Sequence, residues 1–136
     1  MVTCSELGKK KILLVDDDSE IRRLLMLHLG QSSYDTFEAA TGREAVEKAR
    51  AIVPDLIVMD LTMHNGTGAE AIVSIKGDPS TRDIPVVVLT ALVGGALVDR
   101  AVAAGAAEIL HKPVRFEWLD LVLQRYLSMQ NDHISK

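Results

Sequence analysis

Short strand-like runs alternate with helix-like stretches five times, and this alternation constrains the fold more than any other feature of the sequence. Three runs are apolar without interruption: Ile12–Val15, Leu56–Met59 and Val86–Leu89. Weaker strand patterns cover Tyr34–Ala39 and Glu108–His111. A short, continuous apolar run is typical of a strand that is buried on both faces. The sequence therefore predicts repeated βα units.

Each strand is followed by a stretch in which apolar residues recur with the helical period of 3.6 residues. These residues are Ile21, Leu24, Leu25, His28 and Leu29; Ala45, Val46, Ala49 and Ile52; Ile72, Val73 and Ile75; Leu97, Val98, Ala101 and Val102; and Phe116, Leu119, Leu123, Tyr126 and Leu127. Ser19 and Thr41 are positioned to cap the first two helices, while Gly30, Pro54 and Gly105 are positioned to end helices. The segment from Met129 onward is predicted to be a polar tail.

Five such alternations predict an α/β fold, a doubly wound parallel sheet with helices on both faces, because parallel strands need crossover connections and dry faces. The 136 residues are 48% hydrophobic, which is enough for one core and too little chain for two packed domains. We expect one domain over residues 10–128, with flexible termini at 1–9 and 129–136.

Composition excludes several classes of function. The net charge of −4 and the aromatic content of 4% argue against nucleic-acid binding. The apolar runs are far shorter than the roughly 20 residues that a membrane helix needs. Cys4 is the single cysteine, so an internal disulfide or a thiolate metal cluster is excluded. With no secretory signal pattern in Met1–Lys11, we expect a cytoplasmic protein.

Polar side chains stand at the ends of the predicted strands, where α/β sheets bind their ligands. They are Asp16 and Asp17 after the first strand, Asp60 after the third, Thr90 after the fourth and Lys112 after the fifth. An acid at such a position is often only a helix cap, and we interpret Asp18 in this way. Five polar residues in register instead favour a ligand site.

The acids of this cluster need a cation. Two carboxylates about 5 Å apart repel by on the order of 3 kcal/mol at an effective dielectric constant near 20. Lys112 offsets one charge, and an all-oxygen ligand set favours Mg²⁺ for the rest. A carboxylate beside such an ion suits phosphoryl transfer. We assign the nucleophile to Asp60, which follows four buried apolar residues, whereas Asp16 and Asp17 begin a loop.

Four segments together resemble the receiver domain of two-component response regulators: Val15–Asp18, Met59–Met63, Leu89–Ala91 and His111–Pro113. The resemblance covers roughly Lys10–Leu127. It implies a five-stranded parallel sheet in the order 2-1-3-4-5 with five flanking helices, a CheY-like and flavodoxin-like architecture. The strand order comes from this resemblance, since periodicity does not determine it.

The resemblance also implies roles for the acidic residues. Asp60 would be the phosphoacceptor, loaded by a sensor histidine kinase or a phosphotransfer protein. Asp17, Asp60 and the backbone carbonyl of Thr62 would bind Mg²⁺ directly, and Asp16 would bind it through water.

The remaining motif residues would act on the phosphoryl group. Lys112 would pair with the acyl phosphate, and Thr90 would move its hydroxyl toward a phosphoryl oxygen. Ala91, being small, would leave the site open and offer its backbone N–H. Pro113 resembles the cis proline that follows the lysine in this family.

Three positions depart from the family pattern. His64 stands where a proline is usual, and we interpret it as a solvated loop histidine; contact with the phosphoryl group is the alternative. Thr67 stands where an acid is common and is a candidate helix cap. Ile109 replaces the usual switch aromatic, so we expect Thr90 still to move and the response to spread through the fourth helix and the loop before it.

We interpret the chain as a stand-alone receiver that is not an enzyme beyond its own phosphotransfer and autodephosphorylation, and that signals by phosphorylation-dependent binding of an unidentified effector protein. Trp118 and Leu121 point away from the core stripe, and the fourth helix, fifth strand and fifth helix form the surface expected for a partner or a second copy. Two alternatives remain. One is a receiver-like module that binds without phosphate, and the other is a haloacid-dehalogenase-type phosphohydrolase that uses Asp16 as nucleophile, with Asp18 completing the acid pair.

Overall fold

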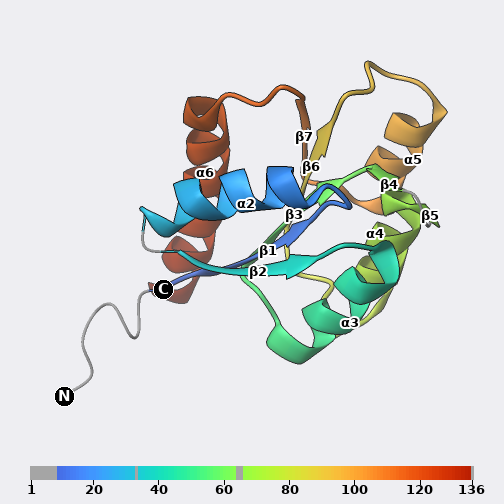
Figure 1. Ribbon diagram of the computed structural model, residues 1–136. Helices are drawn as coiled ribbons and strands as arrows, with labels where there is room; N and C mark the ends of the chain where they lie inside the picture. Colours follow the sequence, from blue (N-terminus) through green and yellow to red (C-terminus); the bar gives the residue numbers. More distant parts are fainter. Residues whose placement is uncertain (1–8, 33, 64–65, 136) are drawn as a thin grey trace.

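Five parallel strands form one sheet in the order β2-β1-β3-β6-β7, with helices on both faces (Figure 1). The computed structural model describes residues 9–32, 34–63 and 66–135. The strands of this sheet are β1 (Lys11–Val15), β2 (Asp35–Ala39), β3 (Leu56–Asp60), β6 (Val86–Thr90) and β7 (Glu108–His111). Counted along the chain, this is the order 2-1-3-4-5. The predicted doubly wound topology is therefore confirmed.

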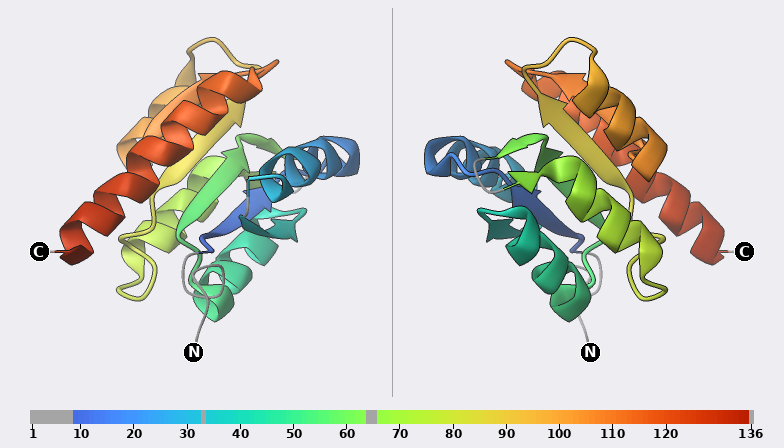
Figure 2. Two further views of the ribbon diagram at one scale, coloured as in Figure 1. Left: turned by 90° about the vertical axis from the view of Figure 1, so that its left-hand side faces the viewer. Right: turned by 90° about the vertical axis from the view of Figure 1, so that its right-hand side faces the viewer.

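The helices divide between two cores, one on each face of the sheet. They are α2 (Ser19–Gly30), α3 (Gly42–Ile52), α4 (Gly68–Gly77), α5 (Ala96–Ala104) and α6 (Phe116–Ser135). Helices α2 and α6 cover one face, while α3, α4 and α5 cover the other (Figure 2). Along β1, Ile12 and Leu14 face the first group, and Leu13 and Val15 face the second. Because both faces are buried, this strand is apolar at every position after Lys11.

The first helix is capped by Asp18 and not by Ser19. The Asp18 backbone is extended, and its carboxylate accepts the N–H groups of Glu20 at 2.9 Å and Ile21 at 3.4 Å. Ser19 is already the first residue of the helix, so the predicted Ser19 cap is wrong and the interpretation of Asp18 as a cap is confirmed. A carboxylate suits this place because it also meets the positive end of the helix dipole.

Other predicted helix boundaries are confirmed. The Thr41 hydroxyl accepts the Glu44 N–H at 3.0 Å and caps α3. Gly105 ends α5 with a φ of 114°, a left-handed conformation that glycine adopts without strain. Its N–H donates to the carbonyl groups of Ala101 and Val102.

Two segments differ from the prediction. The stretch expected to be a loop contains an antiparallel pair, β4 (Thr62–Met63) with β5 (Gly66–Thr67). Helix α6 extends to Ser135, although the sequence predicts a polar tail from Met129. No Gly or Pro interrupts residues 116–135, so the backbone continues the helix beyond the apolar stripe that marks its packed part.

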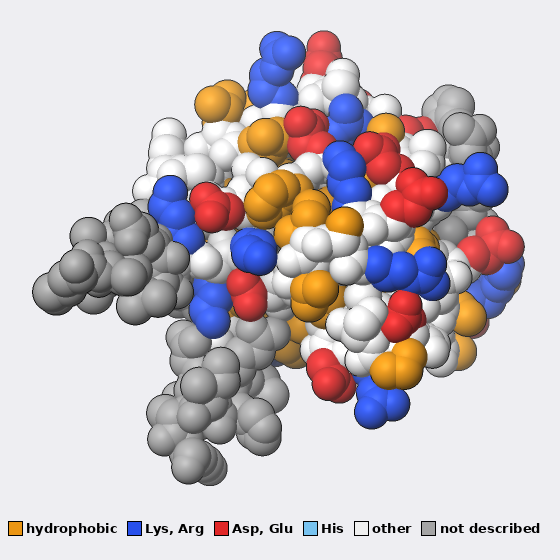
Figure 3. Space-filling view, turned by 90° about the horizontal axis from the view of Figure 1, so that it is seen from below, with side chains coloured by type: hydrophobic (Ala, Val, Ile, Leu, Met, Phe, Trp, Pro, Cys, Tyr) orange, Lys and Arg blue, Asp and Glu red, His pale blue; other side chains and the backbone are white. Residues whose placement is uncertain are grey.

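The surface mixes charges of both signs. On the face shown in Figure 3, the described Lys and Arg side chains alternate with Asp and Glu. Elsewhere the surface carries ion pairs such as Lys9–Asp35 at 3.6 Å and Arg50–Asp78 at 2.8 Å. The described residues on the face shown in Figure 3 form no continuous basic patch of the kind that attracts a phosphate backbone. Among the described residues, no helix has the length and apolar character needed to cross a membrane.

Gly68 brings the start of α4 directly against the end of β3. Its N–H donates to the Leu61 carbonyl at 3.1 Å. A Cβ at this position would lie 2.7 Å from the Asp60 backbone oxygen and 3.2 Å from the Leu61 Cα. Both neighbours are backbone atoms, so a side chain here would displace the strand end that carries Asp60.

We expect Gly68→Ala to destabilise the protein by about 1–3 kcal/mol, because the crowded backbone must shift. Gly77→Ala is the matched control in the same helix, since nothing lies within 4 Å of a Cβ there. Alanine at position 77 should be neutral or stabilising by up to about 1 kcal/mol. Urea unfolding of both variants measures the difference, and equal stability of the two would contradict the close approach at Gly68.

Candidate functional site

The predicted polar residues meet at the carboxyl edge of the sheet. Asp16 and Asp17 follow β1, Asp60 ends β3, Thr90 ends β6 and Lys112 follows β7. The parallel register aligns these ends: Val15 lies opposite Met59, Asp60 opposite Leu89, and Thr90 opposite His111. Residues that are up to 96 positions apart in the chain therefore share one edge.

Three carboxylates form a tight cluster there. One carboxylate oxygen from each of Asp16, Asp17 and Asp60 lies within 4.8 Å of the others. Asp16 and Asp60 are each only 4% exposed, while Asp17 is half-buried. Such an arrangement of oxygen donors fits a hard divalent cation such as Mg²⁺.

Lys112 is the cation that faces this cluster. Its Nζ lies 3.0 Å from Asp16 Oδ2 and 3.5 Å from Asp60 Oδ2. Its backbone N–H donates to the Thr90 carbonyl at 2.8 Å, which ties the end of β7 to the end of β6. Burial lowers the pKa of Lys112, but the hydrogen bond that Lys112 donates to Asp16 and the charges of Asp60 and Asp16 outweigh it, so the net pKa is raised. The ammonium therefore stays charged.

The folded protein disfavours the ionised form of Asp60. Burial and the charge of Asp16 raise its pKa, against the opposing effect of Lys112 and the Thr62 N–H. That N–H donates to Asp60 Oδ1 at 3.2 Å, and the Thr62 hydroxyl lies 3.4 Å from the same oxygen. One lysine does not fully compensate the buried acids, so a further positive charge would stabilise the ionised form of Asp60.

Thr90 and Ala91 flank the cluster on the next strand. Thr90 is fully buried, and its hydroxyl accepts the Leu92 N–H at 3.0 Å. Ala91 is exposed at the rim. Ile109 on β7 is half-buried and packs against the core shared by α3, α4 and α5.

The structure thus brings together Asp16, Asp17, Asp60 and Lys112, with Thr62 beside Asp60. The peptide bond between Lys112 and Pro113 is cis, as the resemblance implied. His64 and the Thr67 side chain, both singled out in the sequence, lie outside the described residues.

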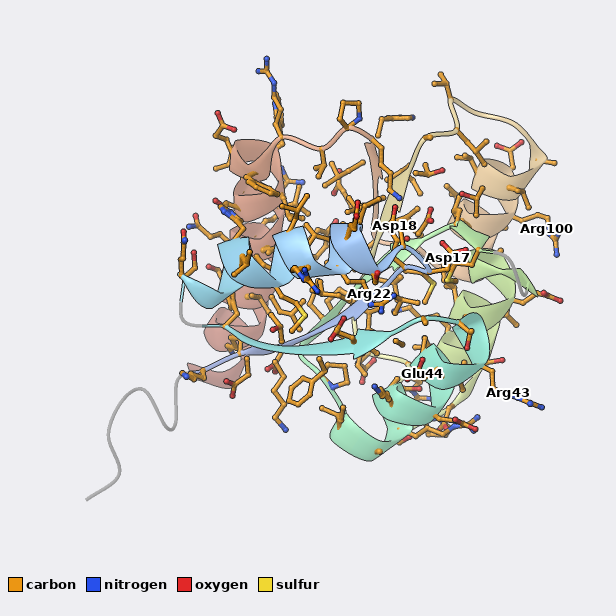
Figure 4. The ribbon with its side chains drawn as sticks, viewed as in Figure 1. Asp17, Asp18, Arg22, Arg43, Glu44 and Arg100 are labelled. Carbon is orange, nitrogen blue, oxygen red and sulfur yellow. The ribbon has the colours of Figure 1, made fainter. Side chains whose placement is uncertain are left out.

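Sequence reasoning missed Arg22, which lies beside the β1–α2 loop (Figure 4). Its guanidinium contacts the backbone of Asp16 and the carboxylate of Glu38. The residue stands on the polar side of α2, and no local pattern distinguishes it from the neighbouring Arg23. Its position relative to β2 becomes evident only once the sheet order is known.

Comparison with known proteins gives a consistent result. A family model described as the response regulator receiver domain matches residues 12–124. The chemotaxis protein CheY of Thermotoga maritima is 38% identical over 106 residues, which cover 76% of this chain and 86% of that protein. The transcriptional regulatory protein PdtaR of Mycobacterium tuberculosis is 40% identical over 114 residues, which cover 83% of this chain and 53% of PdtaR.

Some relatives are much longer than the matched region. The match to the response regulator PleD of Caulobacter vibrioides is 36% identical over 104 residues, 76% of this chain, and spans only 23% of PleD. The chain thus spans about a quarter of PleD and about half of PdtaR.

Solved structures show the same fold. The chemotaxis protein CheY4 of Vibrio cholerae superposes with a TM-score of 0.82 at 33% identity, over 88% of this chain and 99% of that one. The receiver domain of the sensor histidine kinase PA1611 from Pseudomonas aeruginosa, solved with a magnesium ion coordinated in its active-site cleft, gives a TM-score of 0.82 at 28% identity. That match covers 88% of this chain and 98% of the other.

The strain at Asp60 predicts that removing its charge stabilises the metal-free protein. Because the pKa of Asp60 is raised in the folded protein, ionisation of this group destabilises the fold. The destabilisation is complete above the folded-state pKa and absent below the ordinary pKa of about 4. Asp60→Asn, measured in EDTA, should therefore be more stable than the unaltered protein at pH 7 and should lose this gain as the pH falls toward 4. Thermal unfolding across this pH range measures the effect.

Asp35→Asn is the control, because it makes the same chemical change at a partly exposed ion pair. It should alter stability by less than about 0.5 kcal/mol. Mg²⁺ should raise the melting temperature of the unaltered protein and have less effect on Asp60→Asn. If Asp60→Asn melts at the same temperature as the unaltered protein, and Mg²⁺ does not change the melting temperature of the unaltered protein, repulsion among the three carboxylates is contradicted.

Proposed function

The chain belongs to the response regulator receiver family, and from this premise we propose that Asp60 accepts a phosphoryl group in a Mg²⁺-dependent reaction and that the phosphorylated protein signals by binding another protein. The observation that carries the proposal is the buried Asp60 carboxylate at the end of β3, between two further acids and the Lys112 ammonium.

The chemistry follows from these groups. An oxygen of Asp60 attacks the phosphorus of a phosphohistidine in line with the bond that breaks, and the P–N electron pair leaves with the imidazole. Lys112 compensates charge on the phosphoryl oxygens, as it already does on Asp16 and Asp60. The rest of the protein contributes by holding the Asp60 carboxylate rigidly at the end of β3 and by positioning the Lys112 ammonium beside it.

Mg²⁺, when bound, would neutralise phosphoryl charge that one lysine does not balance. We propose Asp17, Asp60 and the Thr62 backbone carbonyl as direct ligands and Asp16 as a ligand through water. The three clustered carboxylates support this assignment, as does the magnesium ion in the cleft of the PA1611 receiver.

Residues on β6 and β7 complete the proposed site. Lys112 would pair with the acyl phosphate, Thr90 would turn its hydroxyl to a phosphoryl oxygen, and Ala91 would offer its N–H. With Ile109 in place of an aromatic ring, the response would spread through α5 and the loop before it.

The phosphoryl donor would be a sensor histidine kinase or a phosphotransfer protein. We propose residues 10–128 as the receiver domain, acting as a stand-alone cytoplasmic protein; in support of a single-domain protein, the match covers 86% of the CheY relative. The output surface would comprise α5, β7 and α6, where Trp118 is 58% and Leu121 is 60% exposed. An effector or a second copy would bind there, and catalysis would be limited to the domain's own phosphotransfer and autodephosphorylation.

The hydrolase alternative lacks its second acid. Asp18 would have to protonate a leaving group, but its carboxylate accepts backbone N–H groups at the start of α2. The use of the Asp18 carboxylate as a helix cap supports Asp60 over Asp16 as the nucleophile.

The test is labelling with acetyl phosphate and Mg²⁺, followed by intact mass measurement and peptide mapping. We expect a gain of one phosphoryl group on the peptide that contains Asp60, and none with EDTA or in Asp60→Asn. Asp18→Asn is the matched control at the same rim, because asparagine preserves the helix cap. It should be labelled like the unaltered protein.

Each alternative predicts a different outcome. Label on Asp16 would establish the hydrolase and overturn the proposal. If the protein binds Mg²⁺ but takes up no label, the result would support the alternative of a receiver-like module that binds its partner without phosphate.

A further inference from the structure

Arg22 joins the acidic site to the edge of the sheet. It lies in the first half of α2, and its side chain is only 15% exposed. Its Nη1 donates to the Asp16 backbone carbonyl at 2.5 Å, and its Nε donates to Glu38 Oε1 on β2 at 2.8 Å. One planar guanidinium thus holds two elements through two separate nitrogens.

The Asp16 carbonyl belongs to the peptide unit that leads into Asp17. The Asp16 N–H is fixed by the Ala39 carbonyl at 3.1 Å, and its carboxylate is fixed by Lys112 and by the Asp18 N–H at 2.9 Å. The bond from Arg22 fixes the remaining polar group of this residue. It therefore sets the plane of the peptide from which the Asp17 side chain departs.

The residue that Arg22 contacts on β2, Glu38, is itself held in place by a hydrogen bond from α3. The Glu38 backbone carbonyl accepts a hydrogen bond from Lys48 Nζ. Lys48 pairs with Glu44 Oε2 at 3.1 Å, and Glu44 Oε1 accepts the Ala40 N–H at 2.7 Å. Figure 4 shows Arg22 and Glu44 on the side of the molecule where α2, β2 and α3 meet. A chain of charged groups thus runs from α3 through β2 to the Asp16 backbone.

On the basis of the proposed function, we propose that Arg22 is a positioning residue for Mg²⁺ binding. It holds the β1–α2 loop so that the Asp16 and Asp17 carboxylates face Asp60, and it does so through the Asp16 backbone rather than by touching the ion. Arginine suits the task because its fork spans both acceptors at once, whereas a lysine nitrogen reaches one at a time.

The sign of the effect separates positioning from simple electrostatics. Arg22 is a cation near a cation site, so removing its charge alone would strengthen Mg²⁺ binding. Loss of positioning would weaken it, as happens when groups that orient metal ligands are removed. The two explanations predict opposite changes in the dissociation constant.

The experiment titrates the metal-free full chain with Mg²⁺ by calorimetry. We expect Arg22→Ala to raise the Mg²⁺ dissociation constant about tenfold. Arg23→Ala removes the same charge from the next, exposed residue, and should leave the constant unchanged or slightly lower. Arg22→Lys keeps the charge but loses the planar fork of the guanidinium, so it should show most of the same loss of Mg²⁺ affinity. It replaces Arg22→Ala as the test variant if Arg22→Ala does not fold.

Two further measurements separate positioning from general loosening of the fold. Glu38→Gln should also weaken Mg²⁺ binding, but should add nothing in the Arg22→Ala background, because the two residues act as one unit. In Arg22→Ala, the rate of labelling by acetyl phosphate at saturating Mg²⁺ should stay close to that of the unaltered protein. The Mg²⁺ concentration that gives the half-maximal rate should rise about tenfold.

Unchanged or tighter Mg²⁺ binding in Arg22→Ala or Arg22→Lys would overturn the inference and leave the proposed function standing. Additive effects of Arg22→Ala and Glu38→Gln would overturn it as well. If the unaltered protein neither binds Mg²⁺ nor takes up label, the proposed function itself fails, and this outcome is visible before any variant is made.

Discussion

The mutual repulsion of three carboxylates at one edge of the sheet is the interaction on which the rest of the site depends. Oxygens of Asp16, Asp17 and Asp60 lie within 4.8 Å of one another, and two of these residues are buried. At such distances each pair of charges costs about 3 kcal/mol in a medium of moderate dielectric. One lysine does not balance three such charges, so a positively charged ligand would stabilise the cluster.

The sheet tolerates this repulsion because it supplies rigid counter-groups. Lys112 reaches two of the acids from the far side of the cluster, and its own backbone is bonded to β6. Arg22 binds the Asp16 backbone carbonyl and the Glu38 carboxylate instead of the clustered carboxylates. Under the proposed function, Lys112 therefore compensates charge and Arg22 fixes geometry.

The sequence predicted the parts of this structure that depend on local pattern. Continuous apolar runs identified the buried strands, and polar residues at their ends identified Asp16, Asp60 and Lys112. Pattern failed where the determinant is not local. The choice of Asp18 over Ser19 as cap depends on the path of the chain leaving β1, and the contact of Arg22 with Glu38 depends on β2 lying beside β1. The length of α6 was missed because a helix continues wherever nothing breaks it, even after its apolar stripe has ended.

The hydroxyl of Thr90 connects the site to the surface under the proposed function. It now accepts the Leu92 N–H, so turning it to a phosphoryl oxygen removes the acceptor of that backbone group. The loop that follows is poorly anchored: Gly94 and Gly95 have φ values of 79° and 97°, and Gly95 is the N-cap of α5 and provides no side-chain cap. A rearrangement of this loop is therefore cheaper than one in a capped helix. Ile109 and Val98 of α5 pack against the same core, so under the proposed function we expect a shift of this helix to reach that core without a rotating ring on β7.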